Sequence, residues 1–408
     1  MAAERIQTLV IGGGQAGLAM SHRLKQRGLP HLVLERNRIA ERWRSERWDG
    51  LRFQFPNWSV RLPDFAFPHH DPDGFSASSD ILDYITAYAA FVAPPIRCGV
   101  AVTKLRRADN ASGFIAETSA GTIEADHVVV ATGPYQRAII PALRERLKLF
   151  QVHASRYANP ETLPDGAVLV VGAGASGAQI AEELLRAGRR VYLSVGRHTR
   201  LPRRYRGRDL IWWLREMGVD QTPVEMRGPS RLLPVISGAH GGDTIDFRRF
   251  AEQGITLLGR ITAARDGVLE IAPDLAESLA NGDATYAGFL DRADAHVAAA
   301  KLDMPLDPAA RAVRPDPACL TAPLLSLDLG AHHINSVIWA TGYGVDFGWI
   351  DLPVLNPQGE PVHHHGISQV PGLYFLGLQW LSKMSSSFLS GVGDDAAGLA
   401  DHIAARSL

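Results

Sequence analysis

One glycine-rich motif occurs twice in this chain of 408 residues, and it limits the choice of folds more than any other feature. In each copy, Gly-x-Gly-x-x-Gly stands between a strand-like apolar run and a stretch with helical periodicity. The first glycine permits a tight turn, the second lets the backbone approach a pyrophosphate, and the third allows the helix to pack closely. Free N–H groups at the helix N-terminus then bind the phosphate charge. The six motif glycines are Gly12, Gly14, Gly17, Gly172, Gly174 and Gly177.

The first motif has the features of a flavin nucleotide site. Glu35 closes the strand that follows the first helix, where a carboxylate can accept hydrogen bonds from ribose hydroxyls. An unphosphorylated ribose beside a carboxylate suits FAD. We therefore expect FAD here, with Gln15, Ala16 and Arg36 as further contacts.

The second motif lacks the acidic residue. Val195 stands at the matching position, and Arg197 and Arg200 follow it. Guanidinium groups bind a 2′-phosphate bidentately, whereas a carboxylate would repel it, so this site predicts NADPH with Ser176 at the start of the helix. A solvated basic loop is the alternative. A nucleic-acid patch is disfavoured because the formal net charge is -1.

The order of the motifs predicts an α/β fold with two Rossmann-like, three-layer dinucleotide-binding domains, the second inserted in the first. We expect the FAD-binding domain to cover residues 1–155 and 326–408, and the NADPH-binding domain to cover 156–325. Within the insert, residues 268–312 have a polar, helical pattern without a recognisable motif. No apolar run reaches the roughly 20 residues of a membrane-spanning helix. A strand begins at once near Ile6, which leaves no room for a leader and predicts a cytoplasmic protein.

The number and spacing of the cysteines limit how a reduced flavin could pass on its electrons. The two cysteines, Cys98 and Cys319, are far apart in sequence, whereas a dithiol relay needs a closely spaced pair. A reduced flavin would then pass its electrons to O2, to a quinone or to a protein partner.

Further motifs resemble those of the class B flavoprotein monooxygenases, with the flavin-containing type most similar. Trp43-x-x-x-Arg47-Trp48 is similar to the aromatic and arginine stretch beside the flavin. His153-x-x-x-Tyr157 is similar to the second half of the family fingerprint, although 147–149 reads Leu-Lys-Leu where Phe-x-Gly is expected. Two turns resemble the family's interdomain crossings. They are Ala131-Thr132-Gly133 and Ala340-Thr341-Gly342.

The resemblance implies that NADPH reduces the flavin, that O2 forms a flavin C4a-hydroperoxide, and that one oxygen atom enters a small organic substrate. It also implies catalytic roles for Asn57, as a hydrogen-bond donor, and for Arg47, beside the nicotinamide or flavin carbonyls. Asn57 could equally form a turn, and Arg47 could simply stack on aromatic rings. Gln379 and Asp395 would complete the FAD site, unless Asp395 only caps the last helix.

The expected partners are the substrate and O2, without nucleic acid, and with a homodimer left open. N-oxygenation, S-oxygenation and Baeyer–Villiger chemistry all stay open. The alternatives are an NADPH-dependent flavin reductase or oxidase and a slow-turnover regulatory flavoprotein. His363-His364-His365 does not predict a metal site, because three consecutive residues cannot all face one ion and no acidic or cysteine ligand stands nearby in sequence. Trp212 and Trp213 could line a substrate cleft or pack an insert helix, and core packing is favoured.

Overall fold

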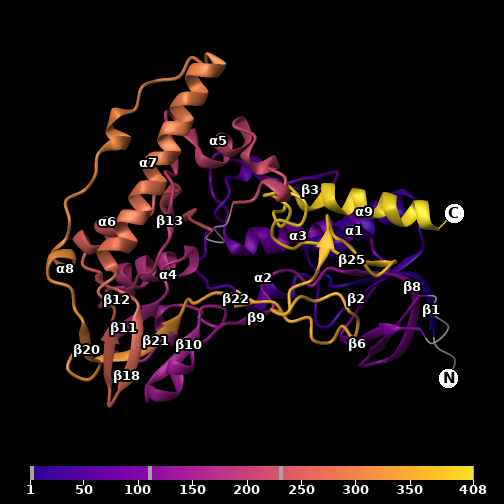
Figure 1. Cartoon of the computed structure of the whole chain (residues 1–408), viewed down its shortest axis with the longest axis horizontal. Helices are drawn as coiled ribbons and strands as arrows, with labels where there is room; N and C mark the ends of the chain where they lie inside the picture. The colour runs from indigo at the N-terminus through magenta and orange to yellow at the C-terminus, as the bar shows by residue number, and fades with distance from the viewer. Residues whose placement is uncertain (1–3, 109–112, 229–232, 408) are drawn as a thin grey trace.

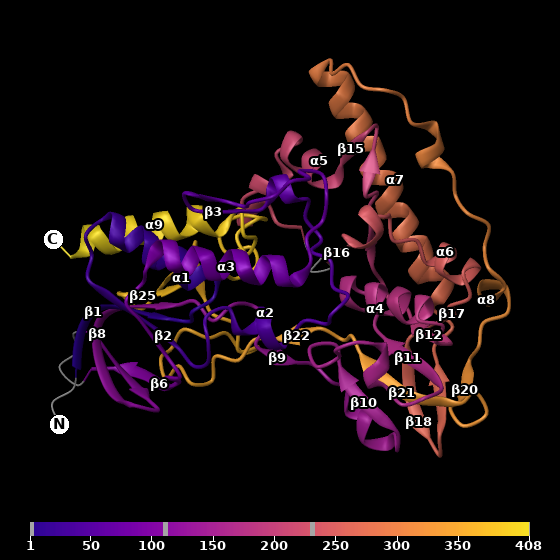
Figure 2. The same cartoon turned by 180° about the vertical axis from the view of Figure 1, so that it is seen from behind.

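The computed structural model describes residues 4–108, 113–228 and 233–407. Two bodies lie side by side, and both ends of the chain belong to the same one (Figure 1, Figure 2). The body with the two ends is called the first unit, and the other is called the second unit. The chain leaves the first unit, builds the second, and returns, as predicted.

The first unit is built on five parallel strands in the order β25-β8-β1-β2-β5. Helices α1, α3 and α9 lie together over one face (Figure 1), and β6 and β7 continue antiparallel from β8. The core strands are Glu4–Ile11 (β1), His31–Glu35 (β2), Ile96–Cys98 (β5), Gly121–Val130 (β8) and Leu373–Phe375 (β25). The other elements are Gln15–Gln26 (α1), Ser78–Val92 (α3), Val392–Arg406 (α9), Val102–Arg107 (β6) and Phe114–Thr118 (β7).

The second unit repeats this plan with five parallel strands in the order β10-β21-β11-β12-β17. An antiparallel sheet, β18-β19-β20, corresponds to the β6-β7-β8 sheet of the first unit. The parallel strands are Phe150–His153 (β10), Ala167–Val171 (β11), Val191–Ser194 (β12), Thr256–Leu258 (β17) and Ile334–Trp339 (β21). The others are Ala175–Arg186 (α4), Phe247–Glu252 (α6), Ile261–Arg265 (β18), Val268–Ile271 (β19) and Ser326–Asp328 (β20).

Burial explains why the central strands form where they do. Every residue of β11 is buried, and so are the last four residues of both β1 and β8. Strands covered on both faces need such continuous apolar runs. In both units the buried end of the central strand leads directly into the glycine turn.

The predicted domain limits differ from the sheets. Strand β10 lies before residue 156 and β21 lies after residue 325, yet both pair within the second sheet. The reason is that β21 has the same apolar pattern as β8, and this pattern does not say which of two similar sheets a strand joins.

Two short strands join the units. Strands β9 (Arg137–Ala138) and β22 (Tyr343–Gly344) pair antiparallel, with Ala138 opposite Tyr343. Each follows one of the Ala-Thr-Gly turns. The structure therefore places both turns at the crossings between the units, as the sequence predicts.

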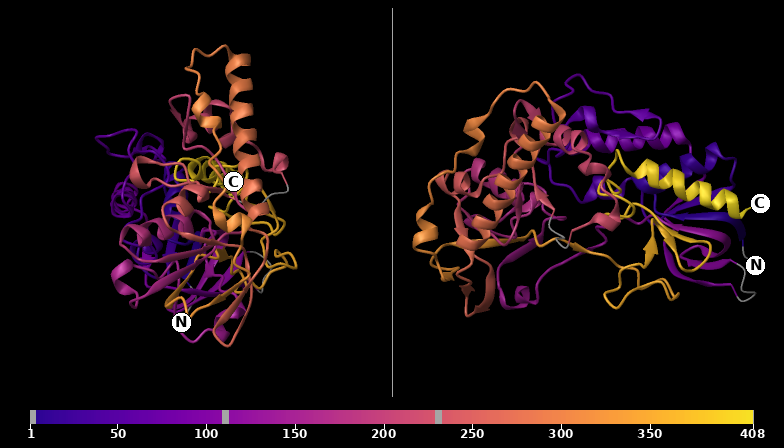
Figure 3. Two further views of the ribbon diagram at one scale, coloured as in Figure 1. Left: turned by 90° about the vertical axis from the view of Figure 1, so that its left-hand side faces the viewer. Right: turned by 45° about the horizontal axis from the view of Figure 1, so that its top comes forward.

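The second unit carries a projecting helix. Helix α7 (Leu275–Ala300) extends away from the sheet, and the chain returns beside it (Figure 1, Figure 3). The helical prediction for 268–312 is right for this segment and wrong for 268–271, which form β19. Trp213, in α5 (Leu210–Glu216), is fully buried, which confirms core packing for it, whereas Trp212 is only partly buried. No helix in the described ranges combines the length and apolarity that crossing a membrane requires.

Shorter elements complete the chain. They are Glu41–Ser45 (α2), Asn57–Ser59 (η1), Arg61–Leu62 (β3), Phe65–Ala66 (β4), Ala142–Arg146 (η2), Pro160–Thr162 (η3), Thr199–Arg200 (β13), Arg204–Tyr205 (β14), Arg208–Asp209 (β15), Val219–Gln221 (η4), Val224–Met226 (η5), Pro234–Val235 (β16), Ala239–Gly241 (η6), Pro308–Arg311 (η7), Ala318–Thr321 (α8), His363–His364 (β23) and Ile367–Ser368 (β24).

Candidate functional site

The two glycine turns have nearly the same geometry. Gly12 and Gly172 adopt φ of +121° and +99°, a region that side chains disfavour. A Cβ on Gly12 would lie 2.5 Å from the Ala131 carbonyl oxygen, and a Cβ on Gly172 would lie 2.5 Å from that of Ala340. Each Ala-Thr-Gly turn therefore packs directly against a glycine turn, which leaves no room for a side chain.

The third glycine of each motif lets its helix pack tightly. A Cβ on Gly17 would lie 1.8 Å from the Gly12 carbonyl oxygen, and a Cβ on Gly177 would lie 1.9 Å from that of Gly172. Only glycine allows these contacts. They hold the first turns of α1 and α4 against the ends of β1 and β11.

The second glycine of each motif faces open space. A Cβ on Gly14 or on Gly174 would meet no atom of the described chain within 4 Å. Both residues are the N-caps of their helices, in extended conformations with no side-chain cap. The fold itself does not require glycine at these positions. Free space before unpaired helix N–H groups fits a pyrophosphate that approaches the backbone.

Glu35 is held in place beside the first turn. Its Oε2 accepts a hydrogen bond from the Gly13 N–H at 2.7 Å, and its Oε1 accepts one from Asn37 at 2.9 Å. Gln15, the first residue of α1, donates from Nε2 to the Ser387 carbonyl at 2.9 Å, and Ala16 is buried behind it. Arg36 is exposed at the rim of a cavity between the units. The structure thus places Glu35, Gln15 and Ala16 at the first turn, and their contact with FAD stays a prediction.

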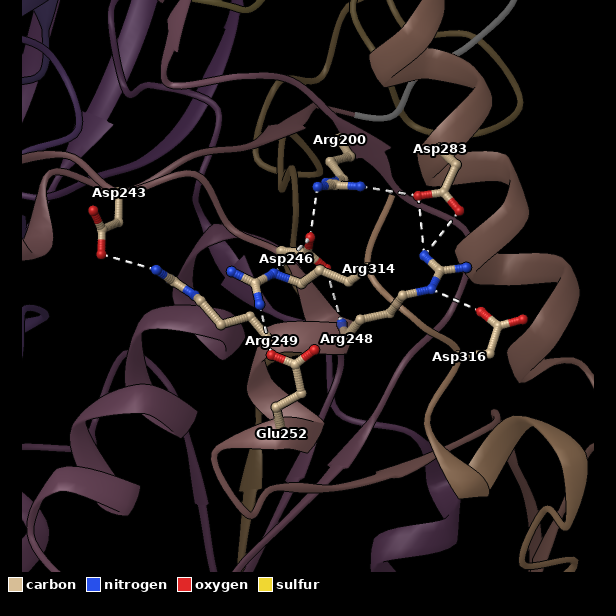
Figure 4. Close-up of polar contacts among 9 residues, drawn as sticks. All are labelled: Arg200, Asp243, Asp246, Arg248, Arg249, Glu252, Asp283, Arg314 and Asp316. Atoms are coloured by element: carbon tan, nitrogen blue, oxygen red, sulfur yellow. Dashed lines mark hydrogen bonds and ion pairs between the residues drawn. The ribbon is translucent and has the colours of Figure 1, made fainter. Parts of the chain in front are cut away.

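The two arginines proposed for the 2′-phosphate have different surroundings. Val195 is buried, Arg197 is exposed, and Ser176 occupies the first turn of α4. The Arg200 guanidinium instead donates to Asp246 at 2.6 Å and to Asp283 at 2.9 Å (Figure 4). A guanidinium that already pairs with two carboxylates has little capacity left for a phosphate. The structure therefore argues against the role predicted for Arg200 and leaves Arg197 as the candidate.

Arg200 belongs to a network that packs α6 and the loop before it against α7 (Figure 4). Arg248 bonds Asp283 on α7 at 2.8 Å and Asp316 on the returning chain at 2.8 Å. Sequence spacing could not reveal this, because Arg200 and Asp283 are 83 residues apart. The network is structural.

Arg47 lies over the Trp43 ring, with its guanidinium carbon 4.8 Å from the ring centroid. It donates one hydrogen bond, to the Glu46 carbonyl at 2.8 Å, and burial lowers the pKa of its guanidinium. Tyr343 at the second crossing is close enough to interact with this charge. The stacking interpretation is confirmed. The remaining N–H groups can still serve a bound nucleotide, so a catalytic role stays a prediction.

Asn57 is buried in η1 and closes a loop. Its Nδ2 donates to the Asp71 carbonyl at 2.9 Å, and its Oδ1 accepts a bond from the Ser76 hydroxyl at 2.7 Å. These contacts are what a turn-forming Asn makes. One amide N–H is left for another acceptor, so its role as a donor in catalysis stays a prediction.

Gln136 clamps the two crossings together. Its Nε2 donates to the Thr132 hydroxyl at 2.9 Å and to the Gly133 carbonyl at 2.8 Å, and its Oε1 accepts from the Asp346 N–H at 2.6 Å. Sequence reasoning missed this residue, although it lies only three residues after the first Ala-Thr-Gly turn. Thr341, in the second turn, donates to the Ile139 carbonyl.

The His153-x-x-x-Tyr157 motif contacts both the second Ala-Thr-Gly turn and helix α4. His153 Nε2 contacts the Gly342 carbonyl oxygen at 3.1 Å, and the Tyr157 hydroxyl donates to Glu183 of α4 at 3.0 Å. Glu183 was not predicted. It lines a cavity of about 580 Å³ between the units, together with Trp48, Arg52, Gln179 and His240.

The C-terminal segment folds back onto the first glycine turn, where Ser387 contacts Gln15. Gln379 Nε2 donates to the Tyr135 hydroxyl at 3.2 Å. Asp395 lies within the first turn of α9, where Gly391 is the N-cap, and it accepts a hydrogen bond from Ser382. Burial raises the pKa of this carboxyl. The capping alternative is therefore wrong, and the contact of Asp395 with FAD stays a prediction.

Comparisons with known proteins agree with this geometry. A family profile described as pyridine nucleotide-disulphide oxidoreductase matches residues 9–214. A relative from Geobacillus kaustophilus (strain HTA426), named uncharacterized oxidoreductase CzcO-like, is 36% identical over 403 residues, covering 98% of each chain. Indole-3-pyruvate monooxygenase YUCCA8 from Oryza sativa subsp. indica is 31% identical over 313 residues, covering 67% of this chain and 70% of that protein.

Solved structures share the whole fold. A flavin-containing monooxygenase from Stenotrophomonas maltophilia superposes with a TM-score of 0.68 at 18% identity, covering 99% of this chain and 100% of that one. Bacillithiol disulfide reductase from Staphylococcus aureus gives a TM-score of 0.63 at 14% identity, covering 99% and 100%. This chain therefore belongs to the pyridine nucleotide-disulphide oxidoreductase family, in which it is related by sequence and fold to the flavoprotein monooxygenases that the sequence analysis predicted.

Proposed function

We propose that this chain is an FAD- and NADPH-dependent monooxygenase that inserts one oxygen atom of O2 into a small organic substrate and releases the other as water. The observation that carries the proposal is the duplicated glycine turn, with open space before Gly14 and Gly174 alike. A monooxygenase among the relatives and another among the solved structures of the same fold support the choice of reaction.

The residues of this chain would divide the work. The helix end at Gly14 would bind the FAD pyrophosphate, with Glu35 on the ribose hydroxyls. The helix end at Gly174 and the exposed Arg197 would bind NADPH. Bound FAD supplies the redox and oxygen chemistry. The partly buried Arg47, beside Tyr343 of the second crossing, and the remaining Asn57 N–H would orient the reacting groups.

The family description suggests electron transfer through a dithiol relay, but the positions and pKa values of the two cysteines argue against such a relay. Cys98 is exposed at the end of β5 in the first unit, and Cys319 lies in α8 of the second unit. Both are free thiols. Burial raises the pKa of each, whereas reactive thiols need a lowered pKa. We expect the Cys98→Ser and Cys319→Ser variants to keep their turnover rates.

The decisive experiment mixes the NADPH-reduced protein with oxygenated buffer in a stopped-flow instrument. A transient absorbance distinct from both oxidised and reduced flavin supports the proposal, as does ¹⁸O from ¹⁸O2 in the product of a tertiary amine, a thioether, a ketone or indole-3-pyruvate. NADPH consumption that yields only hydrogen peroxide, with no transient and with no product from any of these probes, would favour the oxidase alternative.

A further inference from the structure

Three side chains of metal-ligand type meet on the surface. Glu225 comes from η5 of the second unit, and His364 and His365 come from the hairpin that begins with β23 in the first unit. Their ligand atoms all lie within 4.8 Å of one another. No other trio of His, Cys, Asp and Glu in the described ranges meets this criterion.

The contacts of this trio are specific. Glu225 Oε1 lies 2.8 Å from His365 Nε2 and 3.6 Å from His364 Nε2. The two imidazole rings stack with a centroid distance of 4.1 Å and an interplanar angle of 16°. Both rings therefore present the same nitrogen to one carboxylate.

The backbone explains why two of the three consecutive histidines can cooperate. Successive strand residues point to opposite faces, so His363 and His364 diverge. The partly buried His363 packs beside Phe375 and accepts the Gly366 N–H at 3.3 Å. His365 leaves the strand with φ of +48°, which brings its ring beside that of His364. Glu225 lies 140 residues away from His365 in sequence, so spacing along the chain does not reveal this third ligand.

We propose that Glu225, His364 and His365 form a binding site for a divalent first-row transition ion of the Zn²⁺ type. Imidazole nitrogens with a carboxylate suit Zn²⁺, whereas Ca²⁺ and Mg²⁺ prefer oxygen ligands throughout. Tetrahedral Zn²⁺ with bonds of roughly 2.0–2.2 Å holds its ligand atoms about 3.3 Å apart. The separations of 2.8 and 3.6 Å lie close to this value. Each nitrogen lone pair lies in the plane of its own ring, so one or both of the stacked rings must rotate out of the stack before both nitrogens can bind one ion.

An ion bound by this trio would lie at a contact between the two units. The segment before Glu225 already lies along the C-terminal loop of the first unit, with Val224 N–H donating to the Ser382 carbonyl at 2.8 Å. Lys383 Nζ also donates to Gln221 at 2.8 Å. A bound ion would add a link between the two units beside the loop that leads into α9. All three ligands are exposed, so the ion would exchange with solvent. This inference does not depend on the proposed oxygenation.

The test titrates the full-length, FAD-loaded protein, free of any histidine tag and treated with chelator, with Co²⁺ followed by its visible absorption, and then with Zn²⁺ in competition. Wild-type protein should bind one ion per chain, and Zn²⁺ should raise its Tm. Glu225→Gln and the double variant His364→Ala, His365→Ala should each bind at least roughly tenfold more weakly and lose the Tm shift.

The chain supplies a matched control. His69 and His70 are also adjacent and exposed, and they belong to no such trio. The double variant His69→Ala, His70→Ala should bind Co²⁺ and Zn²⁺ as wild type does. Because Glu225→Gln preserves the size of an exposed side chain, its FAD content should stay at the wild-type level. Co²⁺ binding that Glu225→Gln leaves unchanged, or a wild-type protein that binds no ion, would overturn the proposal.

Discussion

The glycine turns allow cofactor binding to be separated from folding by two substitutions three residues apart. In Gly17→Ala, the new Cβ would lie 1.8 Å from the Gly12 carbonyl oxygen, whereas real contacts of this kind stay above 3.0 Å. The helix or the turn must therefore move by about 1.2 Å, the difference between these two distances. Overpacking of this kind costs about 1–3 kcal/mol, or several degrees in Tm for a unit of this size.

In Gly14→Ala, the new Cβ meets nothing of the chain within 4 Å, and the backbone is already extended. The Tm of the apoprotein should stay the same or rise slightly, because alanine lowers the conformational entropy of the unfolded chain, which stabilises the folded state by about 0.4–1 kcal/mol. The same Cβ would occupy the space where we propose that the FAD pyrophosphate approaches the backbone. We expect FAD affinity to fall at least tenfold, or about 1.4 kcal/mol.

The assay is thermal unfolding of FAD-free protein, paired with fluorescence titration of FAD. Gly174→Ala and Gly177→Ala provide the same pair in the second unit, with NADPH as the titrant. Two results would contradict these roles of the glycines: a Gly14→Ala variant that retains FAD as well as wild type does, or one that destabilises the apoprotein as much as Gly17→Ala does.

Two further predictions concern charged side chains of the second unit. Arg197→Ala should raise the KM for NADPH roughly 10- to 100-fold, which corresponds to the loss of a charge-assisted hydrogen bond, and should leave the KM for NADH unchanged. Arg200→Ala should instead lower Tm by the equivalent of about 1–3 kcal/mol, with little change in the ratio of the KM for NADPH to the KM for NADH. Steady-state kinetics with both nucleotides and thermal unfolding distinguish these outcomes, and a loss of NADPH preference in Arg200→Ala alone would reverse the assignment. Burial raises the pKa of Glu183, so its charged form destabilises the folded state above that pKa, and the penalty fades as the pH falls to the ordinary value. Glu183→Gln should therefore gain Tm over wild type at neutral pH and lose that gain near pH ~4; a gain that is constant with pH would contradict the assignment.

The sequence predicts local elements well because their signals are local. The glycine turns at Gly12 and Gly172 each stand between an apolar run and an amphipathic stretch, and the structure has strand, turn and helix at both places. Periodicity and glycine conformation are properties of neighbouring residues, so a single sequence carries them.

A single sequence does not carry information about which distant segments pair with each other. Strand β21 could have joined either parallel sheet on its apolar pattern, and only the fold assigns it to the second. Arg200 follows the glycine motif at a plausible distance for a phosphate ligand, yet Asp283 reaches it from α7. In both cases the missing information is which of several chemically equivalent partners lies nearby.

The same long-range contacts explain how one chain can hold two nucleotides in a defined relation. The Ala131 carbonyl supports the first glycine turn and the Ala340 carbonyl supports the second, each at the distance where a Cβ would clash. Each supporting residue leads within a few positions into the paired strands β9 and β22, and Gln136 bonds both crossings. A shift of either turn must therefore be transmitted to, or resisted by, the same short pair of strands. The relative placement of the two proposed pyrophosphate sites is for this reason a property of the crossings and of Gln136, rather than of either unit alone.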